Sequence, residues 1–232
     1  MEYNSICNKY QTDKGDKLPN GNGYAEFYQK WFEEIKDTCQ NILEIGVEGG
    51  SSLKTNYEFF KNANIIGLDI NNKEEFQNER IKTFVLDQGK SQDLESFYGY
   101  CDSNNLTFDI ILDDGSHDVE HQQKTFGKFF KLLKSKGLYI IEDLCTSYFI
   151  LGQELYGNYQ TQEKINNDTI KFLNQRPFFS PWISNENLEY INEKVEYVTI
   201  FDKLNSNLTY SKEKKCINEY PIRSITSIIK KK

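Results

Sequence analysis

Short, continuous runs of hydrophobic residues alternate with amphipathic stretches between residues 41 and 143. This pattern is typical of parallel β-strands that are buried on both faces and connected by helices. The five hydrophobic runs cover residues 41–46, 64–70, 81–87, 108–114 and 138–143. We therefore expect an α/β fold with a Rossmann-like, doubly wound and mostly parallel sheet.

Helices are predicted between these strands, at residues 51–63, 91–101 and 117–137. In the last of them, hydrophobic residues recur near helical spacing from Val119 to Leu133, and Gly137 stands where a C-terminal cap belongs. A further helix, at residues 24–35, is expected in an N-terminal helical segment that comprises residues 1–40.

The pattern changes after residue 143. Residues 144–190 are rich in aromatic side chains and contain no clear strand, so we expect a partly helical insert that covers one end of the sheet and the substrate. Residues 195–204 and 208–215 are separated by Asn-Ser-Asn and predict a C-terminal antiparallel hairpin, within residues 191–232, that closes the sheet. Because the chain has no repeats and no low-complexity linker, we expect one domain over residues 1–232.

Composition and charge narrow the class of protein. The net charge is −7, and the only basic cluster is Lys230–Lys232, which we interpret as a solvated end, so no nucleic-acid partner is expected. The five cysteines are far apart and form no Cys-x-x-Cys pair, which argues against a disulfide framework and against a cysteine-ligated zinc site. With no evident signal peptide and no apolar run near the ~18 residues that span a bilayer, we expect a cytoplasmic protein.

Acidic residues follow the predicted strands at the edge where open parallel sheets bind ligands. The first strand leads into a turn with Gly46, Gly49 and Gly50, which lets a ligand approach the backbone and the start of a helix. The turn matches neither the dinucleotide nor the P-loop glycine pattern. Asp69 lies 23 residues after Gly46 and can accept hydrogen bonds from both hydroxyls of a ribose.

The later strands continue this arrangement. The third is followed by Asp87 and Gln88, which suit an adenine amino group and its ring nitrogen. The fourth and fifth end on the acidic pairs Asp113-Asp114 and Glu142-Asp143. An acidic residue at every later strand end is hard to attribute to solvation alone, and it predicts a functional site at this edge of the sheet.

Five segments, taken together, resemble class I S-adenosylmethionine-dependent methyltransferases. They are Leu-Glu-Ile-Gly-Val-Glu-Gly-Gly-Ser-Ser-Leu (43–53), Gly-Leu-Asp-Ile (67–70), Val-Leu-Asp-Gln (85–88), Phe-Asp-Ile-Ile-Leu-Asp-Asp-Gly-Ser-His (108–117) and Gly-Leu-Tyr-Ile-Ile-Glu-Asp-Leu-Cys-Thr-Ser-Tyr (137–148). More narrowly, they are similar to the branch of macrolide-sugar O-methyltransferases and cephalosporin-hydroxylase-like proteins. Residues 10–15 and 23–32 resemble the N-terminal segment of that branch. Two departures are the absence of a histidine soon after the Thr12–Gly15 loop and a serine, Ser51, where the branch often has glycine.

The resemblance implies S-adenosylmethionine and Mg²⁺ as cofactors, with residues 41–143 as the cofactor-binding core. The residues expected to bind S-adenosylmethionine are Glu44, Gly46, Ser52, Asp69, Asp87, Gln88 and Asp113. The implied Mg²⁺ ligands are Asp114, Glu142 and Asp143, an oxygen-rich set that suits this hard ion.

Both histidines of the chain follow the fourth strand, in the sequence His117-Asp-Val-Glu-His121. This sequence fits an inverted zinc-peptidase pattern. We reject that interpretation because His117 lies only three residues past a strand, where a helix is just beginning. His121 is instead expected to be an exposed or capping residue of the first helical turn. His117 is expected beside the metal, as the general base that receives the proton of a substrate hydroxyl.

We therefore expect a Mg²⁺-dependent O-methyltransferase that acts on a hydroxyl of a sugar, nucleotide sugar, glycoside or other small polar metabolite in glycan or natural-product biosynthesis. A homo-oligomer is compatible with the sequence. Two alternatives remain open: a metal-dependent hydrolase or hydroxylase that uses the same carboxylates, and a catalytically inactive methyltransferase-fold partner subunit.

Overall fold

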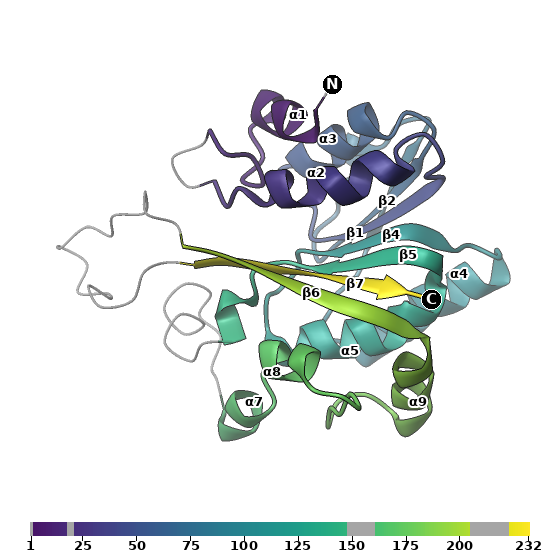
Figure 1. Cartoon of the computed structure of the whole chain (residues 1–232). Helices are drawn as coiled ribbons and strands as arrows, with labels where there is room; N and C mark the ends of the chain where they lie inside the picture. Colours follow the sequence, from purple (N-terminus) through teal and green to yellow (C-terminus); the bar gives the residue numbers. More distant parts are fainter. Residues whose placement is uncertain (1, 18–20, 148–160, 205–222) are drawn as a thin grey trace.

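A seven-stranded sheet forms the centre of the protein (Figure 1). The computed structural model describes residues 2–17, 21–147, 161–204 and 223–232. The strands are β1 (Asn41–Ile45), β2 (Asn64–Asp69), β3 (Ile81–Val85), β4 (Phe108–Asp113), β5 (Leu133–Ile141), β6 (Val195–Leu204) and β7 (Arg223–Lys231), in the spatial order β3-β2-β1-β4-β5-β7-β6. Strands β1 to β5 are parallel, and β7 is antiparallel to both β5 and β6. This arrangement confirms the predicted fold class.

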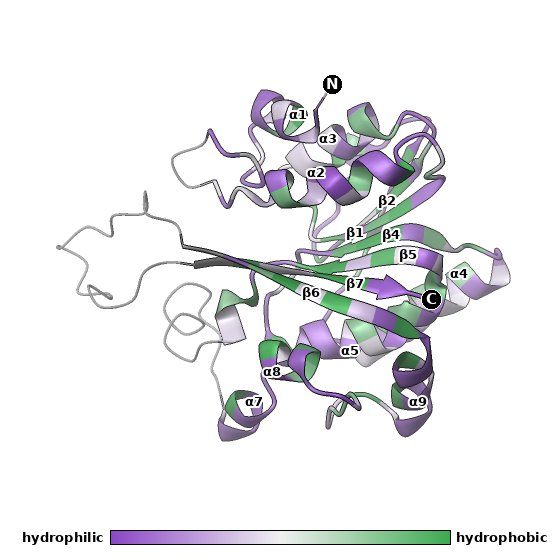
Figure 2. Ribbon diagram, viewed as in Figure 1, coloured by the Kyte–Doolittle hydropathy of each residue, from purple (hydrophilic) through white to green (hydrophobic). Residues whose placement is uncertain are grey.

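Helices cover both faces of the sheet. One face carries α1 (Tyr3–Tyr10), α2 (Tyr24–Ile35) and α3 (Ser51–Phe59), and the other carries α4 (Ser91–Ser103), α5 (Val119–Phe129), α8 (Thr169–Asn174) and α9 (Asn185–Lys194) (Figure 1). Alternate strand residues enter different cores: Ile42 packs with α1 to α3, whereas Leu43 packs with α4, α5 and α8. Because both faces are buried, hydrophobic residues predominate in the central strands, which are drawn largely in green in Figure 2.

Helix α5 is shorter than predicted. The Asp118 side chain caps its N-terminus by accepting from the backbone N–H of Glu120. The helix ends at Phe129, a single 3₁₀ turn (η2, Phe130–Leu132) follows, and β5 begins at Leu133. Gly137 is therefore inside β5 and is not a helix cap. Leu133 pairs with Phe108 of β4, so pairing to the neighbouring strand overrides the helical spacing that continued to this residue.

The first strand of the C-terminal hairpin lies where it was predicted, but the strand that pairs with it lies later in the chain than predicted. Strand β6 matches residues 195–204, but its partner is β7, and residues 208–215 lie outside the described residues. The terminal lysines are not all solvated as predicted: Lys232 is exposed, but Lys231 is buried and its ammonium donates to the carbonyl oxygens of Phe130 and Leu133. Strand β7 is inserted between β5 and β6, so pairing on both sides fixes the end of the chain in the sheet.

The segment after β5 contributes to the α5 face. It begins with a 3₁₀ turn (η3, Leu144–Ser147) and, after a stretch outside the described residues, continues with α7 (Gln162–Asn166), α8 and α9. Phe172 and Phe178 of this segment belong to the core beneath α5. The aromatic residues at positions 148, 149, 156 and 159 lie outside the described residues, so the cover over the substrate stays a prediction. No helix in the described part of the chain is long and apolar enough to cross a membrane.

Candidate active site

A pocket of about 1190 Å³ lies at the carboxyl ends of the parallel strands. It is located where the strand order reverses between β1 and β4, the usual position of a ligand site in an open α/β sheet. Six of the predicted residues line it on the side of β1 to β3: Glu44, Gly46, Ser52, Asp69, Asp87 and Gln88. Three line it at the ends of β4 and β5: Asp114, His117 and Asp143. Asp113 and Glu142 are buried and are not among the lining residues.

The turn after β1 brings the backbone to the pocket wall. Gly46 has a φ of +88°, and a Cβ atom there would come within 2.0 Å of the carbonyl oxygen of Asp114, so only glycine fits. Asp69 Oδ2 accepts hydrogen bonds of 3.0 Å from the backbone N–H groups of Val47 and Glu48. Asp69 therefore shapes the turn as well as facing the pocket. Ser51 begins α3, and its φ is not positive, so a serine is compatible with this position.

Glu44 is a buried carboxylate at the base of this half of the pocket. Its Oε2 accepts from the Asn56 side-chain amide at 3.0 Å. Its Oε1 and the Ser52 hydroxyl are buried, and apart from their interaction with one another they make no hydrogen bond among the described residues. Burial raises the pKa of Glu44 to about 7, and the nearby charge of Lys14 opposes this shift. Because buried polar atoms are stabilised by hydrogen bonds, the two oxygen atoms suit a ligand that donates hydrogen bonds, such as the ammonium group of a bound methionine moiety.

Gln88 and Asp113 bind one another rather than an open part of the pocket. The Gln88 amide donates to both carboxylate oxygens of Asp113, at 2.8 and 2.9 Å, and its oxygen accepts from the backbone N–H of Ser116 at 2.9 Å. Burial raises the pKa of Asp113 to about 7, and the bond from Gln88 opposes the rise. These two residues thus support the loop after β4. Gln88 also lines the pocket, whereas Asp113 does not, and the cofactor contact of both stays a prediction.

His121 is not the exposed or capping residue that was predicted. The cap of α5 is Asp118, and His121 is half-buried and lines the pocket near Asp87 and Gly89. Its Nδ1 lies 2.8 Å from the Ser116 hydroxyl, and burial lowers the pKa of its imidazole. His121 therefore contributes a neutral, partly apolar surface to the side of the pocket formed by the end of β3.

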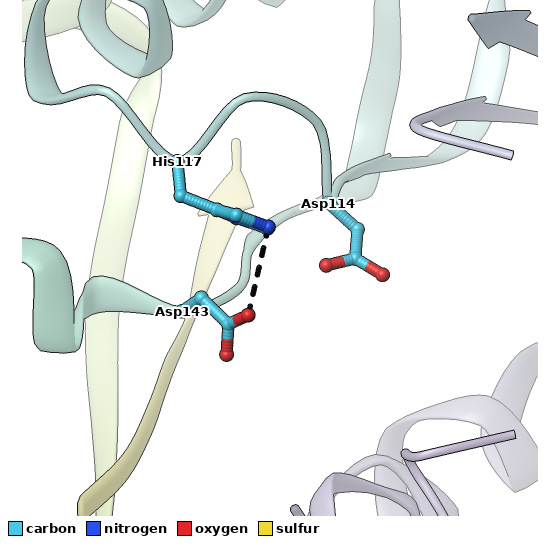
Figure 3. Close-up of side chains that lie close together, drawn as sticks. All are labelled: Asp114, His117 and Asp143. Atoms are coloured by element: carbon cyan, nitrogen blue, oxygen red, sulfur yellow. Dashed lines mark ion pairs between the residues drawn. The ribbon is translucent and has the colours of Figure 1, made fainter. Parts of the chain in front are cut away.

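Asp114, His117 and Asp143 converge on the other side of the pocket (Figure 3). One ligand atom from each lies within 4.8 Å of the others, and His117 Nε2 is 3.7 Å from Asp143 Oδ2. His117 and Asp143 both adopt left-handed backbone conformations, with φ values of 57° and 51°. Non-glycine residues rarely adopt this conformation, and such strain often occurs at functional sites.

Both carboxylate oxygens of Glu142 lie beside other side chains of the protein. Its Oε1 accepts from the Tyr28 hydroxyl at 2.9 Å, and its Oε2 lies 3.0 Å from the ammonium nitrogen of Lys14. The same ammonium is 2.5 Å from Asp114 Oδ2, and the Lys14 side chain is only 1% exposed. Burial alone would lower the pKa of Lys14, but Asp114, Glu142 and Asp13 outweigh it and hold the pKa well above its ordinary value.

Two tyrosines of helix α2 donate hydrogen bonds to the acidic pair after β5. The Tyr24 hydroxyl donates to Asp143 Oδ1 at 2.8 Å, and the Tyr28 hydroxyl also lies 2.7 Å from the hydroxyl of Thr226 in β7. The two tyrosines are four residues apart and so share one face of the helix. Sequence reasoning missed Lys14, Tyr24 and Tyr28 as parts of the site. Two features of the sequence could have indicated them. One is the pair of tyrosine hydroxyls on a predicted amphipathic helix, and the other is the Thr-Asp-Lys-Gly loop, to which no role was assigned.

The geometry therefore fits the implied divalent ion in part. Asp114 and Asp143 face the pocket and offer carboxylate oxygens, the ligands that Mg²⁺ prefers. Glu142 is fully buried: its Oε1 accepts from Tyr28, and its Oε2 lies 3.0 Å from Lys14 Nζ but has no hydrogen-bond partner among the described residues. Asp114 and Asp143 thus face the pocket beside the imidazole of His117, and the role of Glu142 as a ligand stays a prediction.

Comparisons with known proteins agree with this architecture. Residues 39–202 match the family described as "Methyltransferase domain". Demethylmacrocin O-methyltransferase of Streptomyces fradiae is 35% identical over 158 residues, which are 64% of this chain and 38% of that protein. An 8-demethyl-8-(2-methoxy-α-L-rhamnosyl)-tetracenomycin-C 3′-O-methyltransferase of Streptomyces olivaceus is 34% identical over 140 residues, 57% of this chain and 35% of that protein. The chain thus spans less than two-fifths of these relatives.

A solved structure has the same fold over the whole of this chain. It is the MycE methyltransferase of the mycinamycin biosynthetic pathway in complex with Mg, SAH and mycinamycin VI. The TM-score is 0.67 at 23% sequence identity, over 100% of this chain and 54% of that chain.

Proposed function

The chain belongs to the methyltransferase domain family, and on this premise we propose that it transfers the methyl group of S-adenosylmethionine to a hydroxyl oxygen of a sugar or another small polar metabolite. The observation that carries the proposal is that two kinds of binding site share one pocket. One side offers a glycine turn and buried hydrogen-bond acceptors, and the other offers two carboxylates and an imidazole. The name of the Streptomyces olivaceus relative describes methylation of a rhamnosyl compound, which supports a sugar as the acceptor.

The cofactor half would hold S-adenosylmethionine by its two polar ends. Glu44 Oε1 and the Ser52 hydroxyl would accept from the methionine ammonium, since both are buried and their interaction with one another leaves lone pairs of both oxygens available. Asp69 would accept from the ribose hydroxyls at the end of β2. The adenine would then lie toward Asp87 and His121, which line the same pocket. These positions would leave the sulfonium methyl facing the ends of β4 and β5.

The acceptor half would orient the oxygen and remove its proton. A sulfonium methyl is already electrophilic, so the chain has only to align the hydroxyl and accept a proton. His117 is the candidate base: it lines the pocket, and its Nε2 points into the space shared with Asp114 and Asp143 (Figure 3). A positioned base contributes roughly 10²–10⁴ in rate. A divalent ion held by Asp114 and Asp143 would supply positive charge that makes the acceptor hydroxyl more acidic.

The test is the formation of S-adenosylhomocysteine when the protein is incubated with S-adenosylmethionine, Mg²⁺ and a panel of nucleotide sugars and glycosides. Turnover should require both an acceptor and the divalent ion, and EDTA should abolish it while leaving cofactor binding largely intact. Calorimetric titration with S-adenosylhomocysteine separates this function from its alternatives. A metal-dependent hydrolase on this fold should not bind the compound, and an inactive partner subunit should show neither turnover nor a requirement for metal.

A further inference from the structure

Helices α7 and α8 lie on the α5 face of the sheet, and α8 packs against α5 (Figure 1). We propose that these two helices, here called the α7–α8 segment, position His117 and Asp143 for the proposed methyl transfer. They do so through an ion pair between Lys164 and Asp118 and through hydrogen bonds of Gln122. The inference rests on the proposed function and adds positioning residues to its site, since none of these three lines the pocket.

His117 and Asp143 share an uncommon backbone conformation. Their φ values are 57° and 51°, in the left-handed region. This conformation is unfavourable for residues other than glycine, and it persists only where the surrounding structure holds it. Each residue is directly adjacent to one that is connected to the α7–α8 segment: Asp118 follows His117, and Glu142 precedes Asp143.

Lys164 of α7 makes the first connection. Its ammonium nitrogen lies 2.6 Å from Asp118 Oδ2 and 3.5 Å from Glu120 Oε2. The side chains of Lys164 and Asp118 are only 15% and 7% exposed, so solvent screens this ion pair less than an exposed one. Asp118 Oδ1 accepts from the backbone N–H of Glu120 as the cap of α5. The residue after His117 is thus bound to α5 by one oxygen and to α7 by the other.

Gln122 of α5 makes the second connection. It is 1% exposed, and its amide donates to the carbonyl oxygen of Glu142 at 3.1 Å. Its side-chain oxygen accepts from the hydroxyl of Thr169, the first residue of α8, at 2.8 Å. The peptide group that joins Glu142 to Asp143 is therefore connected through Gln122 to α8.

Both connections end within residues 164–169, so a displacement of this short stretch would move both loops. The stretch is itself bound to α5, because the amide of Gln123 donates to the carbonyl oxygen of Asn167 at 2.6 Å. His117 Nε2 and Asp143 Oδ2 are 3.7 Å apart at the pocket. A misplacement of about 1 Å at a reacting group costs on the order of 10²-fold in rate, so these connections bear directly on the chemistry.

The kinetic test uses the double variant Lys164→Met/Asp118→Asn and an acceptor from the panel above. Asparagine caps a helix about as well as aspartate, so this variant removes the ion pair without leaving a buried charge or an uncapped helix. Turnover should fall by about 10- to 100-fold, and the KM for S-adenosylmethionine should change by less than about threefold. Lys124→Met, which removes an ion pair with Glu120 of the same helical turn, is the matched control. Turnover of the double variant equal to that of the control would overturn the inference.

Coupling to His117 separates positioning from a general effect on stability. In a chain that carries His117→Ala, the double variant should lower turnover by less than about twofold, because the base that it would displace is already absent. A further loss as large as in the unmodified chain would show that the ion pair does not act through His117.

The two histidines of the chain also allow a test without cofactor or acceptor. Their imidazole signals in proton NMR spectra are assigned with His121→Ala. The signals of His117 should broaden in the double variant, because its backbone is held less firmly, and should stay narrow in Lys124→Met. Equally narrow signals in both variants would overturn the inference. If no acceptor yields S-adenosylhomocysteine, the proposed function fails, and these signals alone decide the inference.

The second connection is tested by the binding of Mn²⁺, a paramagnetic substitute for Mg²⁺, measured by electron paramagnetic resonance. Gln122→Met should weaken binding by about tenfold, because Asp143 loses support. Gln123→Met is the matched control, since Gln123 is as buried but contacts only the α7–α8 segment and not the strand end. Equal affinities of the two variants would refute the second connection. An unmodified chain that binds no Mn²⁺ would refute the metal requirement of the proposed function, and the His117 signals would still decide the first connection.

Discussion

The two halves of the pocket are built in different ways. On the cofactor side, contacts join residues that are close in the sequence: Asp69 binds the turn after β1 across 22 and 21 residues. On the acceptor side, the contacts span most of the domain. Lys14 reaches Asp114 across 100 residues, Tyr28 reaches Glu142 across 114, and Tyr24 reaches Asp143 across 119.

This difference has energetic consequences. The cofactor side relies on backbone geometry and on individual hydrogen bonds. One substitution there should therefore mainly weaken the binding of a ligand. The acceptor side contains a buried ionic network, in which removing one member leaves another charge without compensation. Substitutions there should therefore affect stability and chemistry together. A substitution of His117, which lines the pocket, should act mainly on the chemistry.

The largest expected effect is on catalysis at the acceptor side. His117→Ala should reduce turnover by roughly two to four orders of magnitude with little change in cofactor affinity, because it removes the base but no cofactor contact. The loss should shrink at high pH, where the acceptor hydroxyl ionises without help. Steady-state kinetics and calorimetry check both statements. The matched control is His121→Ala, which should raise the KM for the cofactor and lower turnover at saturating cofactor far less. Equal losses of turnover in the two variants would reopen a paired-histidine site.

The buried network should dominate stability. Lys14→Met should lower the free energy of unfolding by about 3–5 kcal/mol, because Asp114 and Glu142 lose their buried counter-charge. Urea denaturation measures the change. Lys128→Met, which removes the exposed ion pair with Glu95, is the control and should cost less than about 1 kcal/mol. Adding Glu142→Gln to Lys14→Met should restore much of the loss, and similar costs for the two single lysine variants would contradict the network.

On the cofactor side, Asp69→Ala should weaken S-adenosylhomocysteine binding by about 10- to 100-fold, since a charged acceptor for the ribose and for the turn is lost. Asp109→Ala is a matched control at the opposite end of the sheet. Asp109 Oδ2 accepts from the backbone N–H groups of Gln40 and Asn41, much as Asp69 Oδ2 accepts from Val47 and Glu48. Unfolding of both variants should be similar, and only Asp69→Ala should lose affinity. Unchanged calorimetric affinity in Asp69→Ala would remove Asp69 from the site.

Glu44 should give the cofactor side a pH dependence of its own. Its pKa rises from 4.5 to about 7 on folding because of burial, so between these values the folded state keeps a proton that the unfolded state releases. Stability should therefore fall as pH rises through this window, by at most about 1.4 kcal/mol per pH unit. Comparing unfolding of the unmodified chain with Glu44→Gln from pH 5 to pH 7.5 isolates this contribution. Parallel stability curves for the two proteins would show that Glu44 does not titrate in this range.

The smallest effects concern the two tyrosines of α2. Tyr28→Phe and Tyr24→Phe should each lower the free energy of unfolding by about 1–2 kcal/mol, because each removes one buried hydrogen bond to a carboxyl group. Both should also weaken Mn²⁺ binding, since each tyrosine orients a carboxyl group that is predicted to bind the ion. Tyr57→Phe, which removes a hydrogen bond to the exposed Glu79, is the control for stability. Unchanged Mn²⁺ affinity in Tyr28→Phe would remove Glu142 from the predicted ligands.

The sequence by itself determined the parallel core and the cofactor side. Strands buried on both faces require continuous hydrophobic runs, so the positions of β1 to β4 could be read within a residue or two. The turn at Gly46 and the carboxylate at Asp69 are local features, because they depend on a glycine conformation and on the end of a neighbouring strand. The carboxyl groups after β4 and β5 were visible for the same reason.

Only the tertiary structure decided the rest. The end of α5 and the start of β5 depend on pairing between Leu133 and Phe108, and the last strand depends on pairing to both β5 and β6, which hydrophobic spacing does not encode. The side chains that bind the Glu142 carboxylate, Tyr28 and Lys14, and the tyrosine that binds Asp143, Tyr24, come from the N-terminal segment. Three acidic residues at strand ends look equivalent in a sequence. Their surroundings differ because the fold leaves Asp114 and Asp143 at the pocket wall and buries Glu142 completely, between Tyr28 and Lys14.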